Sequence, residues 1–154
     1  FINFLMSFLA MYPPIYRDRK RAPLNLLALD ELAALLKQGG LFAGLHPEGA
    51  RKLDDDPYSF LPAQPGVGRV IQKAEAIVIP VFIQGLSNNI KEQVIGNFNG
   101  KGKPIHLVFG APMQFGDLLE KKPSPKLHRE ISEKCMAAIA ELAQQDKAVR
   151  GAVI

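Results

Sequence analysis

Hydrophobic residues recur at helical spacing in three stretches of the chain. Between residues 25 and 38, leucine and alanine return every three or four positions, with Asn25 as the predicted N-cap and glycines after the last apolar residue. Two later stretches begin at a proline, which is favoured in the first helical turn. Their opening residues and apolar stripes are Pro65, Gly66, Val67, Val70, Ile71 and Ala74, and then Ser124, Pro125, Leu127, Ile131, Cys135, Ala138 and Leu142.

Three nearly uninterrupted apolar runs predict β-strands at residues 40–45, 76–83 and 105–109. We expect the first to be a buried strand and the second to be buried on both faces, as in a parallel or mixed sheet. Pro80 cannot donate to a β-ladder, so it predicts a bend, a bulge or a sheet edge. Residues 15–16 fit a short strand, and residues 90–96 fit either a short helix or a strand.

The alternation of these strands and helices predicts an α/β fold, in which helices flank a mixed, largely parallel sheet. The length of 154 residues indicates a single domain over residues 1–154. Because the chain begins with Phe1 rather than methionine, we expect its N-terminal part to be incomplete. Residues 1–11 are apolar but shorter than the roughly 20 residues that span a bilayer, so they predict either a buried helix or an interfacial membrane helix.

The charge of the chain favours an anionic partner. The net charge is +4, which suits a phosphate group, a membrane surface or a nucleic acid. Few aromatic residues interleave with the basic ones, so nucleic acid is not expected as a partner. Cys135 is the single cysteine, which excludes an internal disulfide, fits a reducing compartment, and predicts a core position on the last helix stripe.

The most informative polar residues follow the predicted strand at 40–45. The segment reads His46-Pro47-Glu48-Gly49-Ala50-Arg51, and ligands bind where strands of open α/β sheets end. Gly49 lets the backbone approach a ligand, Arg51 can grip a phosphate or carboxylate, and Glu48 can orient that arginine or accept from a substrate hydroxyl.

A second arginine, Arg17, also follows a predicted strand. If Arg17 and Arg51 lie at the same end of the sheet, the two arginines would form a phosphate clamp. The alternative is that Arg17 belongs to an exposed basic face and that Arg51 forms a surface ion pair.

Other chemistries find less support in the sequence. The aspartates at positions 54 to 56 have no further ligand spaced to complete a metal cage, so no metal site is expected. His128 and Glu133 are five positions apart, which places them roughly 140° apart around a helix, too far to cooperate. No phosphate-binding P-loop and no nucleophile elbow is present. The sequence therefore contains no complete general-base dyad, and no catalytic residue is assigned.

These motifs resemble those of the glycerolipid acyltransferases of the lysophosphatidate acyltransferase type. The third motif of that family, roughly Phe-Pro-Glu-Gly-Thr-Arg-Ser, is similar to the stretch from His46 to Lys52. The second motif, a short strand ending in arginine, is similar to Ile15-Tyr16-Arg17, and the fourth is similar to the apolar strand around Pro80. The resemblance covers the chain from about residue 15 to residue 112.

The resemblance implies transfer of a fatty acyl group from acyl-CoA or acyl carrier protein to a hydroxyl of a lysophosphatidate-like glycerol-phosphate acceptor. It implies that Arg17, Glu48, Gly49 and Arg51 bind the phosphate or glycerol portion of that acceptor, with no bound cofactor. It also implies a cytoplasmic protein that lies at the membrane surface, peripherally at the inner face of the membrane.

The chain departs from the family at the catalytic step. The family's His-x4-Asp box precedes the second motif, and no histidine precedes Arg17 here. His46, Ala50 and Lys52 replace the family's phenylalanine, threonine and serine, and His46 is not the family's catalytic histidine. We therefore expect an acyltransferase-family domain that is inactive alone. The alternative is a non-catalytic lipid- or membrane-binding protein that retains the fold.

Overall fold

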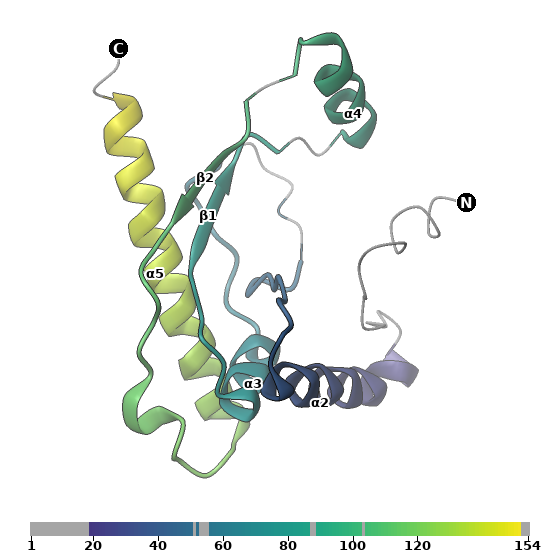
Figure 1. Ribbon diagram of the computed structural model, residues 1–154, viewed down its shortest axis with the longest axis vertical. Helices are drawn as coiled ribbons and strands as arrows, with labels where there is room; N and C mark the ends of the chain where they lie inside the picture. Colours follow the sequence, from purple (N-terminus) through teal and green to yellow (C-terminus); the bar gives the residue numbers. More distant parts are fainter. Residues whose placement is uncertain (1–18, 51, 53–55, 87–88, 103, 152–154) are drawn as a thin grey trace.

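The computed structural model describes residues 19–50, 52, 56–86, 89–102 and 104–151 (Figure 1). Short 3-10 turns occur at η1 (Arg19–Arg21) and η2 (Gly116–Leu118). The longer elements are the helices α2 (Ala22–Gln38), α3 (Pro65–Ala74), α4 (Ile90–Asn99) and α5 (Pro125–Gly151), and the strands β1 (Val81–Gln84) and β2 (His106–Phe109).

All three predicted helices are confirmed. Helix α2 begins four residues earlier than an N-cap at Asn25 would place it, so that prediction was wrong. Arg21 holds that position, and a proline lies in the first turn, where the missing N–H costs nothing. Gly39 ends the helix with a φ of 81°, and its N–H donates to the carbonyl of Leu36 over 3.0 Å. The Oγ of Ser124 caps α5 by accepting from the N–H of Leu127 at 3.1 Å.

Helix α3 packs against both α2 and α5. On one side, Val70 and Ala74 form a buried cluster with Ala33 of α2. On the other side, Ile71 packs in a cluster that includes Ile131 and Cys135 of α5. The side chain of Cys135 is buried in this cluster, which confirms its predicted core position, and this burial raises the pKa of the thiol to about 11.

Helices α3 and α5 touch closely at Gly68. Its N–H donates to the Oγ of Ser132 over 2.8 Å. A β-carbon built on Gly68 would lie 1.8 Å from the carbonyl oxygen of His128. The absence of a side chain at residue 68 is therefore what allows the two helices to approach this closely.

The sheet of the described residues consists of β1 and β2, which pair antiparallel from Val81↔Phe109 to Gln84↔His106. Phe82 points toward α5 and packs with Leu142 and Ala143. The α/β character is confirmed, whereas the expected largely parallel sheet is not what these residues form. The physical reason is the path of the chain. After β1 it passes through α4 and then returns alongside β1 in the opposite direction as β2.

The prediction of a buried strand at residues 40–45 was wrong. Residues 41–46 join no ladder, and the side chain of Phe42 is 96% exposed. Within the part of the chain that the structure describes, no strand lies beside this segment to supply hydrogen bonds and cover its apolar side chains.

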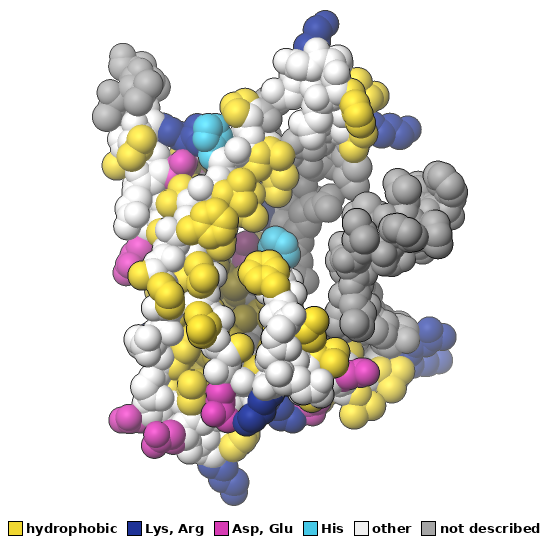
Figure 2. All heavy atoms as spheres, in the orientation of Figure 1, with side chains coloured by type: hydrophobic (Ala, Val, Ile, Leu, Met, Phe, Trp, Pro, Cys, Tyr) yellow, Lys and Arg dark blue, Asp and Glu magenta, His cyan; other side chains and the backbone are white. Residues whose placement is uncertain are grey.

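The strand predicted at 76–83 is shorter than expected, because the ladder begins only after Pro80. That proline has no N–H to donate, although its carbonyl accepts from Gly110 at 2.9 Å. Burial on both faces was also wrong: one face packs on α5, and the other exposes Ile83, Leu107 and Phe109. Figure 2 shows these two strands with hydrophobic side chains at the surface.

Candidate functional site

The loop at Pro47-Glu48-Gly49 is a tight turn placed against the start of α3. The N–H of Gly49 donates to the carbonyl of His46 over 3.1 Å, and the N–H of Gln64 donates to the carbonyl of Pro47 over 2.7 Å. Gly49 has a φ of 65°, and a β-carbon there would lie 2.8 Å from Cγ of Gln64. Both the backbone conformation and the contact therefore favour glycine at this position.

Glu48 ties the turn to Leu61, which lies in the loop that leads from the turn to α3. Its Oε2 accepts a hydrogen bond from the N–H of Leu61 over 2.6 Å, at a partly buried position. This bond gives the carboxylate a structural role that the sequence did not predict. Its expected action on Arg51 or on a substrate hydroxyl stays a prediction.

Aromatic side chains anchor the same loop to β1. Tyr58 stacks on Phe82 with ring centroids 5.9 Å apart, and Phe60 meets the edge of the same ring at 6.3 Å. These anchors were missed by sequence reasoning. Their signal was the alternation of Tyr58 and Phe60 in a stretch otherwise rich in polar residues and proline.

The hydroxyl of Tyr58 also ties the loop to α5. It donates to Oδ2 of Asp146 over 3.0 Å, and Arg150 Nε lies 2.8 Å from the same oxygen. The hydrogen bond from Arg150 lowers the pKa of Asp146, whereas desolvation and then the carboxylate raise the pKa of Tyr58. The Pro-Glu-Gly turn is thus supported through its loop by both β1 and α5.

Neither arginine of the predicted clamp is among the described residues, so the pairing of Arg17 and Arg51 stays a prediction. Lys52, which replaces the family's serine in the third motif, donates from Nζ to the carbonyl of Asp56 at 2.9 Å and to Oγ of Ser59. Among the described residues, no group of three or more histidine, cysteine, aspartate or glutamate side chains is placed to hold a metal ion.

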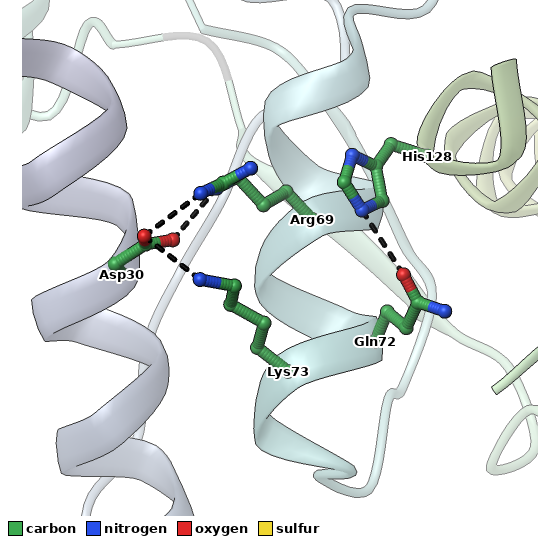
Figure 3. A network of polar contacts seen from close by, with 5 residues as sticks. All are labelled: Asp30, Arg69, Gln72, Lys73 and His128. Carbon is green, nitrogen blue, oxygen red and sulfur yellow. Dashed lines mark hydrogen bonds and ion pairs between the residues drawn. The ribbon is translucent and has the colours of Figure 1, made fainter. Parts of the chain in front are cut away.

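A polar network joins the three core helices (Figure 3). Asp30 of α2 accepts from Arg69 of α3 at 2.6 and 2.8 Å, and Nζ of Lys73 lies 2.8 Å from its Oδ2. One residue before Lys73, Gln72 faces α5, where its Oε1 lies 3.0 Å from Nε2 of His128. The network holds α3 in place, and the first residue of α3 directly follows Gln64, whose N–H donates to Pro47 of the turn.

The tautomer of His128 follows from this network. The Nε2 of Gln72 donates to the carbonyl of Lys121 over 2.8 Å, so its Oε1 accepts and the histidine ring donates. Burial lowers the pKa of His128, which favours the neutral form of the ring. Glu133 is exposed whereas His128 is buried, and the expectation that the two do not cooperate is confirmed.

Asp30 should make the stability of the protein depend on acid pH. The hydrogen bond from Arg69 is the largest cause that lowers its pKa, from 3.8 to about 2. Because the folded pKa is below the unfolded one, this stabilisation is present above pH 4 and is lost as the pH falls from about 4 toward 2. After allowance for solvent screening, we expect a loss of about 1–2 kcal/mol.

Urea unfolding of the protein and of Asp30→Asn between pH 6 and pH 2.5 checks this expectation. The variant should lose less stability than the parent over that interval, whereas Asp117→Asn, at an exposed aspartate, should behave like the parent. Equal losses in the parent and in Asp30→Asn would contradict the assignment of the low pKa to Asp30.

Comparison with known families identifies the family of the chain. A family model, Acyltransferase, matches residues 1–84, which include α2, the Pro-Glu-Gly turn, α3 and β1. The chain therefore belongs to the acyltransferase family, and the resemblance inferred from its motifs is confirmed. Membership supports a general function in acyl transfer. Searches of curated proteins and of solved structures found no match.

Proposed function

We propose that the chain binds the glycerol-phosphate end of a lysophosphatidate-like acceptor for acyl transfer from acyl-CoA or acyl carrier protein. The observation that carries this proposal is the Pro-Glu-Gly turn within the family match, held by the Gln64 N–H, by the Leu61 N–H and by the aromatic anchors of its loop. A turn held at several points can present neighbouring residues in one geometry, which reduces the entropy lost on binding.

Each residue of the proposed site has a distinct task. Arg51, two residues beyond the turn, binds the acceptor phosphate through two parallel hydrogen bonds, and Arg17 contributes the second cation. Gly49 allows the backbone to approach the acceptor. Glu48 positions the turn through Leu61, and its carboxylate charge helps to orient Arg51.

The proposal separates binding from turnover. Acyl transfer requires a base that takes the proton of the acceptor hydroxyl as its oxygen attacks the thioester carbon and the thiolate leaves. The 154-residue sequence contains no His-x4-Asp box, and the described histidines form no dyad with a carboxylate. We therefore propose that this chain alone binds the acceptor without transferring an acyl group to it.

Calorimetry with two matched ligands tests the proposal. A short-chain lysophosphatidate should bind about tenfold or more tightly than the monoacylglycerol that lacks only the phosphate, because charged hydrogen bonds depend on that group. In a parallel thioester assay with acyl-CoA, no thiol release above background is expected. Equal affinity for the two ligands would reject the acceptor site, and turnover that His46→Ala abolishes would reject the separation of binding from catalysis.

We also propose that the chain acts at the inner face of the cytoplasmic membrane, as a peripheral protein, where a lysophospholipid acceptor is available. The net charge of +4 supports attraction to anionic lipid headgroups. No described helix is long and apolar enough to cross a bilayer.

A further inference from the structure

Helix α4 stands apart from the helical core. It lies in the connection between β1 and β2 and projects beyond the end of the two strands (Figure 1). Within the described residues, the three buried hydrophobic clusters draw on α2, α3, α5, the strands and the adjoining loops, but not on α4. The side chains of Val94, Ile95 and Phe98 therefore do not contribute to the core.

The returning chain covers one side of α4 and leaves the opposite side open. The N–H of Gly102 donates to the carbonyl of Gly96 over 2.9 Å, and a β-carbon on Gly96 would lie 2.7 Å from Cα of Gly102. At about 100° per residue, Val94 and Phe98 each lie about 160° around the helix from Gly96. The backbone contact at Gly96 thus turns these two side chains away from the protein.

The open side of α4 is strongly apolar. Phe98 is 90% exposed, Ile95 is 60% exposed and Val94 is 49% exposed. Such large hydrophobic residues gathered on a projection are typical of surfaces that meet a partner rather than water.

Two exposed lysines lie in and next to α4. Residues 86–103 contain three lysines and one glutamate, a net charge of +2, and Lys91 and Lys101 are exposed. Figure 2 shows hydrophobic and basic side chains together on the α4 projection. Apolar side chains bordered by lysine complement a membrane surface, in which anionic headgroups lie above the acyl chains.

We infer that α4 is a membrane-docking element that inserts Phe98, Ile95 and Val94 into the headgroup boundary of an anionic bilayer. Lys91 and Lys101 contact lipid phosphates at the same time. A ten-residue helix is about 15 Å long, which is small for the roughly 800 Å² per partner of a stable protein interface but sufficient for shallow insertion. The inference deepens the proposed function because it brings the site to its lipid acceptor, yet docking requires no acyl transfer.

Tryptophan fluorescence tests the insertion directly, since the chain contains no tryptophan. Phe98→Trp should shift its emission to shorter wavelength when vesicles with about 30% phosphatidylglycerol in phosphatidylcholine are added, and about 0.5 M salt should weaken the effect. Phe42→Trp, at an equally exposed aromatic position outside α4, is the matched control and should not shift. No shift at Phe98, or an equal shift at both positions, would overturn the assignment to α4.

Vesicle co-sedimentation of the full 154-residue chain provides a second measure. Ile95→Ser/Phe98→Ser should reduce binding to the same vesicles by about tenfold, while Phe42→Ser should leave it unchanged. Because the altered side chains are outside the core, the thermal midpoint should stay that of the parent. Unchanged vesicle binding by the double variant would overturn the inference. A parent that is a dimer in solution, and a double variant that is not, would also overturn it and would assign the face to another copy of the chain.

Lysophosphatidate calorimetry on the double variant distinguishes failure of this inference from failure of the proposed function. Loss of membrane docking should leave the affinity for the soluble acceptor unchanged.

Discussion

Replacement of Gly68 by alanine is expected to lower the free energy of unfolding by about 2–3 kcal/mol, the scale of overpacking in a close contact. The new β-carbon would meet the His128 carbonyl oxygen, and this neighbour is backbone that cannot rotate away. Helices α3 and α5 must then separate, which weakens the Gly68–Ser132 hydrogen bond and the cluster around Ile131. The higher helix propensity of alanine offsets at most about 1 kcal/mol of this loss.

Urea unfolding compares Gly68→Ala with Gly44→Ala. Gly44 has an ordinary backbone conformation, and a β-carbon there would meet nothing within 4 Å, so this control should unfold at nearly the parent midpoint. A Gly68→Ala protein as stable as the control would show that the approach of α3 to α5 is not needed for the fold.

Replacement of Arg51 by alanine is expected to weaken binding of short-chain lysophosphatidate by about 1.5–3 kcal/mol, the scale of a hydrogen bond to a charged group. Arg51→Lys should recover part of this loss, because it keeps the charge but cannot form two parallel hydrogen bonds. Calorimetry measures both, with Lys126→Ala at an exposed position of α5 as the control for net charge. Unchanged affinity in Arg51→Ala would show that this arginine is outside the site.

The helices could be predicted from the sequence because their signals are local. The stripe of α3 and the Ser124-Pro125 start of α5 depend on residues within a few turns, and both predictions are confirmed. The start of α2 was misplaced because Asn25 is a good cap in general, while a proline two residues earlier already fits the first turn.

The strands were less predictable because a strand depends on neighbours distant in the chain. Residues 40–45 and 76–83 have strand composition, yet the described part of the chain supplies a ladder only to Val81–Gln84. The predictions of burial were wrong for the same reason, because an apolar side chain such as that of Phe42 is buried only where another element covers it.

For the candidate site, the sequence by itself determined three things: the Pro-Glu-Gly motif, the family of the chain, and the lack of a His-x4-Asp box among these 154 residues. All three are properties of residue identity and order. Only the tertiary structure decided that Glu48 binds the Leu61 N–H, that Tyr58 and Phe60 anchor the loop on Phe82, and that α4 turns Phe98 away from the core. Each of these contacts joins groups whose proximity is set by the packing of several elements, and no local pattern of residues specifies that packing.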